Sequence, residues 1–326
     1  LICRAYSHFV LANMFCMPYN PATAGNCLGI PYMDHAETDL NPRYERGTLQ
    51  EVYEMIGKDI EAGIPLIDDT AYSVPKYHFN YKAACCFASR YYLFMQDWDN
   101  AIKYATMALT SNPSSLLRDY SAIAALPNGT SRHQEYVNSA STANFLLQAA
   151  TSNSGLLFDW YSTAGRYSHG KLQGIYETVQ PKKGGPWGSS VTFKAPHAVL
   201  ASSGKYVLPR TWRVFQYTDP VAGTGFNKAI SVLFTSEEAL LNRAEAYIMK
   251  MNEDPTALDK ALEDINLYAA NLFSAGFKSM TEASIIKWAT ETYPDYSELY
   301  VGKTSVSSPQ TLNPKKKLHA APYNTC

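Results

Sequence analysis

The segment NYKAACCFASRYYLFMQDWDNAIKYATMALTSNP, residues 80–113, decides the fold class of this chain. Apolar residues recur every three to four positions on both sides of a short corner, Gln96-Asp97-Trp98, which is the spacing of two amphipathic helices. The first stripe consists of Ala84, Ala88, Tyr91, Tyr92 and Met95, and the second of Ala101, Ile102, Ala105, Ala108 and Leu109. Small residues in the second stripe let the helices approach closely, while tyrosine rings fill the space between them. We therefore expect an antiparallel pair of helices.

This pair resembles a tetratricopeptide (TPR) unit, which has about 34 residues, a helix-turn-helix pattern and a proline at its end. Tyr92, Ala101, Ala108 and Pro113 match the TPR pattern, whereas Cys85 stands in place of the usual tryptophan. The resemblance implies that the pair belongs to a stack of similar units.

A second pair of helices is predicted at 235–272. Thr235 and Glu238 form a capping box, in which each side chain satisfies a free N–H group of the first turn. Asp254-Pro255 then separates two apolar faces. These faces consist of Leu240, Ala244, Tyr247, Ile248 and Met251, and of Leu258, Ala261, Leu262, Ile265 and Leu272. Two such pairs separated by a long insertion predict a solenoid that carries a lobe.

The chain therefore divides into four sub-regions of one domain. We predict a helical TPR-like region at 1–113, a loop-rich binding lobe at 114–234, a TPR-like helix pair at 235–272 and an irregular tail at 273–326. The expected fold class is mainly α, a TPR-like helix-pair solenoid with a loop-rich lobe that contains short strands.

The composition excludes several classes of protein. Hydrophobic residues make up 46% of the chain and charged residues only 17%, against roughly 25% charged in an average soluble domain. The chain has 24 Tyr and a formal net charge of -1, so it is neither intrinsically disordered nor a typical nucleic-acid binder.

The six cysteines lack zinc-type spacing, and we expect Cys85 and Cys86 to be buried thiols.

The lobe has an unusual composition of its own. Between Ser139 and Thr235 there are three acidic residues against nine basic ones, and three of the five tryptophans of the chain. Glycine and proline are frequent, as in 184–188, GGPWG. Large aromatic residues on loops held by a rigid scaffold are a common arrangement in binding sites. We therefore expect the binding site in this lobe.

Four segments carry a resemblance to a known family. The most specific is 232–247, VLFTSEEALLNRAEAY, and the others are 4–32, 46–62 and 82–101. Their motifs and their order resemble the SusD/RagB family, the surface glycan-binding lipoproteins of Bacteroidetes nutrient-uptake systems. The family's lipoprotein signal, lipidated cysteine and C-terminal signature have no counterpart here. We expect a fragment that lacks both ends, or a divergent member, and no membrane anchor within this chain.

The resemblance implies a function. Such a protein binds oligosaccharide without catalysis at the outer face of the outer membrane and delivers it to a TonB-dependent (SusC-like) transporter. From the residues themselves we expect no cofactor, no metal and no nucleic-acid partner.

Candidate site residues follow from the chemistry of sugars. A sugar ring has apolar C–H patches on its faces and hydroxyl groups around its edge, so a binding site needs flat aromatic side chains with polar groups beside them. The candidate platforms are Trp187, Trp212, Trp160 and Tyr161, and the candidate edge partners are Arg210, Arg213 and Asp219. Trp187 is the leading candidate because its Gly-Pro neighbours favour an exposed loop. For each aromatic residue, the alternative is packing between the lobe and the solenoid.

Two other functions stay open. A TPR-type scaffold would bind a peptide in the helix grooves near Tyr91 and Tyr92. A glycan-cleaving enzyme is the weaker alternative, because it needs two carboxylates that face each other across a site and the lobe has few acids. Arg243 and Glu245, in the most family-like helix, are expected to make structural contacts between helices.

Overall fold

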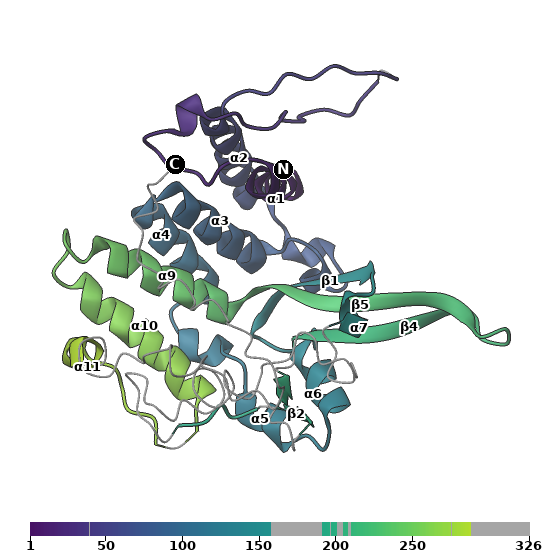
Figure 1. The fold of residues 1–326 in the computed structure, drawn as a ribbon, viewed down its shortest axis with the longest axis vertical. Coiled ribbons are helices and arrows are strands. Elements are labelled where there is room, and N and C mark those ends of the chain that lie inside the picture. Colours follow the sequence, from purple (N-terminus) through teal and green to yellow (C-terminus); the bar gives the residue numbers. More distant parts are fainter. Residues whose placement is uncertain are drawn as a thin grey trace, which may run out of the picture.

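The computed structural model describes residues 1–38, 40–157, 191–195, 197–200, 205–207, 210–274 and 276–287 (Figure 1). The helices of this part of the chain are α1 (Ile2–Phe15), α2 (Leu49–Gly63), α3 (Tyr81–Met95), α4 (Trp98–Leu109), α5 (Tyr120–Ala125), α6 (Gly129–Tyr136), α7 (Ser154–Leu157), α9 (Ser236–Lys250), α10 (Ala257–Leu272) and α11 (Glu282–Lys287). The strands are β1 (Asn144–Thr151), β2 (His197–Leu200), β3 (Lys205–Val207), β4 (Thr211–Asp219) and β5 (Thr224–Thr235).

The two predicted helix pairs are present and stack on each other. Helix α9 packs against both α4 and α10, so the pairs α3–α4 and α9–α10 are neighbours in space although the whole lobe separates them in sequence (Figure 1). The corner between α3 and α4 lies where the sequence placed it. Gln96 has a left-handed backbone with a φ of 60°, and the Asp97 side chain caps α4 by accepting from the Asn100 N–H at 3.1 Å.

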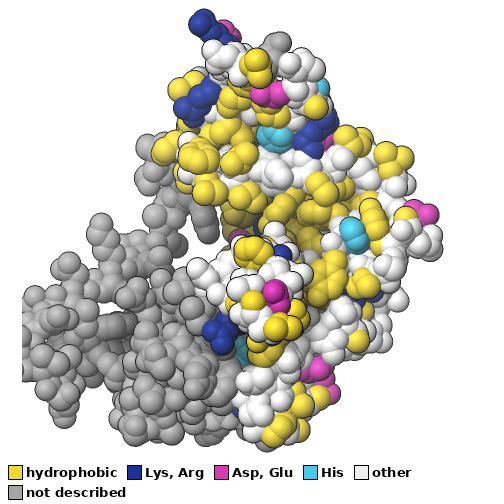
Figure 2. Space-filling view, turned by 90° about the vertical axis from the view of Figure 1, so that its right-hand side faces the viewer, with side chains coloured by type: hydrophobic (Ala, Val, Ile, Leu, Met, Phe, Trp, Pro, Cys, Tyr) yellow, Lys and Arg dark blue, Asp and Glu magenta, His cyan; other side chains and the backbone are white. Residues whose placement is uncertain are grey.

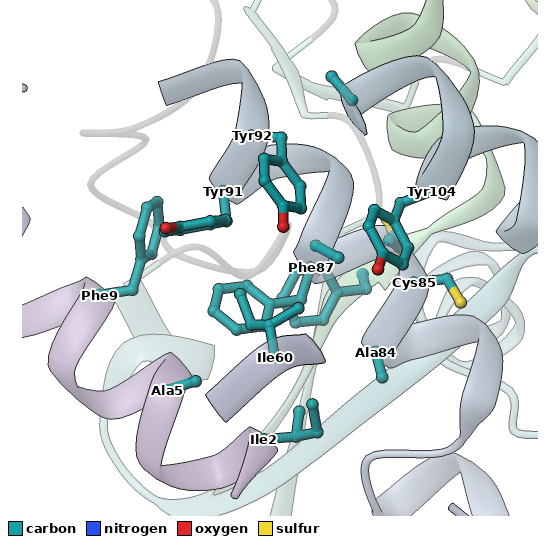
Figure 3. Packing of buried hydrophobic residues seen from close by; sticks show 14 of the residues in the cluster. Ile2, Ala5, Phe9, Ile60, Ala84, Cys85, Phe87, Tyr91, Tyr92 and Tyr104 are labelled. Carbon is teal, nitrogen blue, oxygen red and sulfur yellow. The ribbon is translucent and has the colours of Figure 1, made fainter. Parts of the chain in front are cut away.

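The first core lies between α1, α2 and α3 and is rich in aromatic rings (Figure 3). Phe9, Phe87 and Tyr91 are buried there, and the Phe9 ring lies edge-on to both of the others. Cys85 and Cys86 are fully buried as predicted, and burial raises the pKa of the Cys85 thiol to about 12. These thiols therefore act as small apolar side chains.

A three-stranded antiparallel sheet, in the order β1-β5-β4, joins the lobe to the solenoid. Strand β1 pairs with β5 only as far as the Thr151–Lys228 pair, whereas β4 and β5 stay paired out to Asp219–Thr224. The outer part of the hairpin is thus a two-stranded ribbon that projects from the body (Figure 1). These two strands are longer than the short strands expected for the lobe, because they pair with each other along the whole of β4. Strand β5 then runs without a break into α9.

Four arginine-carboxylate pairs link different elements of the structure. Each joins two elements of the scaffold or joins the scaffold to the lobe: Arg4–Asp59 (2.6 Å), Arg90–Glu238 (2.6 Å), Arg118–Glu237 (3.3 Å) and Arg243–Asp264 (2.7 Å). The expected contact of Arg243 between helices is therefore found, with α10 as the partner helix. Glu245, by contrast, has an exposed position on α9.

Arg118 is the most deeply buried of these arginines, with 2% of its surface exposed. Its guanidinium donates to the Tyr136 carbonyl at 2.8 Å and to Asn144 Oδ1 at 2.6 Å, and it lies 3.7 Å from the centre of the Tyr136 ring. Removal of one partner from a buried ion pair leaves the other charge uncompensated.

We expect Arg118→Met to lower the free energy of unfolding by roughly 3–5 kcal/mol. The double variant Arg118→Met/Glu237→Gln should recover part of this loss, because it removes the stranded carboxylate. Urea denaturation followed by circular dichroism measures the free energy of unfolding of the single and the double variant. Lys260→Met is the control, since its pair with Asp254 is exposed and should change stability little. An equal loss in the single and double variants would contradict the role of the ion pair.

A second prediction concerns pH and the contact between α1 and α2. Burial raises the pKa of Asp59, but hydrogen bonds from Arg4 and Tyr32 at 2.6 Å outweigh it, so the pKa lies below its usual value. The stabilisation that the ionised Asp59 carboxylate gives the folded state is therefore fully present above its unfolded-state pKa of about 4. It is lost as the pH falls through the folded-state pKa of Asp59.

Asp59→Asn should accordingly be less stable than the wild type at pH 7, and the difference should shrink as the pH falls from 5 to 2. The midpoint of urea unfolding at each pH tests this. A difference that stays constant over this range would show that Asp59 does not carry the effect.

Candidate functional site

The outer part of the β4–β5 hairpin, residues 215–227, is called the arm below. Its turn is held by Asp219, whose Oδ1 accepts from the N–H groups of Val221 at 2.9 Å and Ala222 at 3.0 Å. Gly223 provides the left-handed backbone of the turn, with a φ of 66°. The conformation of the tip is therefore fixed by local hydrogen bonds.

The register of the hairpin gives its two faces different roles. Trp212 lies opposite Ile230, and both pack against the second apolar core of the chain, which includes Tyr120 and Phe193. Because side chains alternate along a strand, Arg213, Phe215 and Tyr217 lie on the other face. We call the first the inner face and the second the outer face.

The arm exposes large aromatic side chains. The exposed fraction is 40% for Phe215, 58% for Tyr217 and 55% for Phe226. Phe215 and Tyr217 contact each other edge to face, with ring centres 4.9 Å apart and an interplanar angle of 74°. Phe226 lies opposite Gln216 and therefore on the inner face.

Gly225 makes room for this pair of rings. A Cβ atom at Gly225 would lie 2.1 Å from the Gln216 carbonyl oxygen and 2.9 Å from the Phe215 ring. Glycine is thus required opposite Tyr217, where the ring of Phe215 covers the bare backbone.

Polar side chains surround the rings on the outer face. Asn227 lies opposite Phe215, and its Nδ2 is 3.4 Å from the Oδ1 of Asn153, which follows β1. Arg213 lies at the base of the arm, with its Cβ packed over Gly155 of α7. The outer face therefore combines two exposed rings, two amides and one guanidinium.

A further group of exposed aromatic residues lies on the segment that links α2 to α3 and on the first residue of α3. Tyr72, Tyr77 and Tyr81 are each 37–39% exposed, and the Tyr72 ring stacks on His78 with centres 4.0 Å apart. Figure 2, in which the arm points toward the viewer, shows hydrophobic side chains on the arm and on the body surface above and beside it. The sequence interpretation placed all binding in the lobe and missed this group, which has no helical or strand periodicity.

The structure separates the predicted site residues that it describes. Trp212 is half-buried on the inner face, and Arg213 lies on the outer face. Asp219 lies at the tip of the hairpin, six positions or roughly 20 Å along the strand from Arg213, and its side chain stabilises the turn. Arg210 is exposed just before β4. Burial raises the pKa of Tyr268, and the positive charge of Arg210 partly offsets this rise. These residues do not form one cluster.

The other predicted residues, Trp160, Tyr161 and Trp187, lie outside the described residues. Their role stays a prediction.

The described residues contain few groups that could bind a metal ion or act as an acid near the arm. Among them there is no group of three histidine, cysteine or acidic side chains that could hold a metal ion. Of the three acidic residues between Ser139 and Thr235, Asp219 is the one that the structure describes, and its Oδ1 accepts hydrogen bonds from the turn. No helix in the described ranges has the length and hydropathy needed to cross a membrane.

Comparison with known proteins supports one family. Residues 1–93 match the model of a SusD-like family described as starch-binding and associating with the outer membrane. Comparison of the sequence with curated proteins finds no match.

Three solved structures have a similar fold. A SusD superfamily protein from Bacteroides thetaiotaomicron VPI-5482 has a TM-score of 0.56 and 18% identity over 84% of this chain and 58% of its own. A SusD-like carbohydrate binding protein from Bacteroides vulgatus ATCC 8482 has a TM-score of 0.51 and 17% identity over 88% of this chain and 57% of its own. A SusD-like protein from Bacteroides fragilis NCTC 9343 has a TM-score of 0.51 and 15% identity over 88% of this chain and 62% of its own.

The chain thus spans less than two thirds of the length of each of these structures. The resemblance to the SusD/RagB family is confirmed, as is the mainly α fold with its helix-pair solenoid.

The requirement for glycine at position 225 of the arm can be tested by substitution. We expect Gly225→Ala to disrupt the pairing at the tip, because the new Cβ would overlap the Gln216 carbonyl. Hydrogen exchange at the amides of 215–227 should become faster, while exchange in α3 and α9 stays unchanged. Thr224→Ala, one position away in the exposed tip, is the control. Unchanged exchange in the Gly225 variant would show that the arm does not need glycine there.

Proposed function

We propose that this chain binds oligosaccharide or polysaccharide without cleaving it, at the surface of the bacterial outer membrane, for delivery to a TonB-dependent transporter of the SusC type. The observation that carries the proposal is the match of residues 1–93 to a family described as starch-binding and associating with the outer membrane. The fold supports it, because one of the similar structures is described as a carbohydrate binding protein.

The surface chemistry agrees with this function. Sugars are bound by exposed aromatic rings with uncharged polar groups beside them, and the described surface has such rings on the arm and at Tyr72, Tyr77 and Tyr81. The low charge of the chain favours a neutral, hydroxyl-rich ligand over a charged one.

The TPR-scaffold alternative finds less support. The groove that it would use is filled, because Tyr91 is 2% exposed and Tyr92 is 9% exposed. The Tyr91 hydroxyl donates to the Tyr53 carbonyl at 2.7 Å, and the Tyr92 hydroxyl donates to Glu61 at 2.5 Å. These rings are packing residues, so a peptide could not reach them without opening the core.

The proposed function predicts binding without turnover. Affinity gel electrophoresis of the chain in soluble starch, a β-glucan, a mannan and a xylan should show retardation by at least one polysaccharide. The same mixtures should release no reducing ends over many hours. A folded chain that is retarded by none of the panel would argue against the proposal, and released reducing ends would support a glycan-cleaving enzyme instead.

Trp187 and Trp212 can be compared in the same gels. If Trp187 is a platform, Trp187→Ala should weaken retardation and leave the melting temperature unchanged. Trp212→Ala should instead lower the melting temperature, because its ring is part of the second apolar core. The reverse pattern would assign the platform to Trp212.

A further inference from the structure

We infer that the outer face of the arm is a binding platform for neutral glycan, formed by Phe215, Tyr217 and the amides of Asn227 and Asn153. This inference rests on the proposed function and names a site for it. None of these four residues is among the candidates that the sequence indicated.

The arm is built to hold a fixed shape. A hairpin of two strands is at best marginally stable in water when it stands alone. Here the tip is fixed by the hydrogen bonds of Asp219, and the Phe215 ring covers Gly225. At the base, β5 is paired with both β1 and β4. The rings of the arm are therefore presented in a set position.

The two exposed rings of the outer face are neighbours, which distinguishes them from single exposed side chains. Phe215 and Tyr217 are 40% and 58% exposed on a ribbon that projects from the body, and adjacent exposed apolar groups mark interaction sites. Because the two rings contact each other at 74°, each restricts the motion of the other. Little side-chain freedom is then lost on binding.

The charges around the rings indicate the class of ligand. Within the arm, 215–218 and 220–227 contain no charged residue, and the one carboxylate, Asp219, is engaged by the turn. A nucleic acid or a charged peptide would need opposing charges, which this face lacks beyond Arg213 at its base. Amides beside exposed rings fit the hydroxyl groups and the apolar faces of a sugar.

The inner face of the arm provides an internal comparison. Phe226 is exposed to a similar degree, at 55%, but lies on that face opposite Gln216, and no other ring of the described residues pairs with it. A platform on the outer face needs Tyr217 and Asn227 and does not need Phe226. The two faces of one hairpin therefore supply a test variant and a matched control.

The experiment is isothermal titration with maltoheptaose, or with an oligosaccharide of whichever panel polysaccharide retards the wild type most. We expect Tyr217→Ala and Asn227→Ala each to weaken binding about three- to tenfold, the usual effect of losing one ring or hydrogen-bonding contact. Phe226→Ala should bind within about twofold of the wild type. Circular dichroism and melting temperatures show that each variant is folded.

Four outcomes are decisive. Weaker binding in Tyr217→Ala and Asn227→Ala but not in Phe226→Ala supports the platform. Wild-type affinity in both outer-face variants would overturn the inference and leave the proposed function standing, whereas a wild type that binds no glycan overturns both. Loss of binding to phosphatidylglycerol vesicles in Tyr217→Ala, with glycan affinity unchanged, would assign the outer face to a membrane instead.

Discussion

The junction between β5 and α9 is the constraint on which the rest of the structure depends. Two adjacent glutamates open α9, and each reaches a different arginine. Glu237 meets the buried Arg118 of the lobe, and Glu238 makes a two-point contact with Arg90 of α3 at 2.6 and 2.8 Å. Consecutive residues of a helix point about 100° apart, so one pair of acids can hold both the scaffold and the lobe. Because the strand enters the helix without a loop, the direction of the arm is set by these contacts.

Much of the scaffold was predictable because helices leave strong local signals. The apolar spacing of 80–113, the N-cap at Thr235 and the corner at Asp97 each depend on residues within one or two turns. The predicted capping box at Thr235 is only half formed, because the Glu238 carboxylate binds Arg90 instead of the Thr235 N–H. The partners of Glu237 and Glu238 were not predictable. Glu237 and Glu238 look like ordinary acids at a helix start, and nothing nearby in the sequence indicates Arg118 or Arg90, which are more than a hundred positions away.

The candidate site was harder to predict, since it depends on strand register. Trp212 was selected as a platform for its residue type, but its register places it on the inner face against the core. A shift of one position reverses the face of a strand residue, so Arg213, Phe215 and Tyr217 lie on the outer face. The alternation of 213, 215 and 217 was a usable signal for these residues. The exposed group at Tyr72, Tyr77 and Tyr81 had none, because Tyr72 and Tyr77 lie on short turns and Tyr81 is the first residue of α3.

The many tyrosines of this chain also have two roles that only the structure separates. Inside the scaffold, a tyrosine needs a partner for its hydroxyl group, and Tyr92 and Tyr104 share the same oxygen of Glu61. On the arm, the hydroxyl of Tyr217 is left at the surface, with its ring 58% exposed. A platform of two rings contacts few sugars, so its affinity for a single sugar unit is low. A polymer brings many equivalent units to the same platform, and the high local concentration of those units makes a shallow, rigid site sufficient.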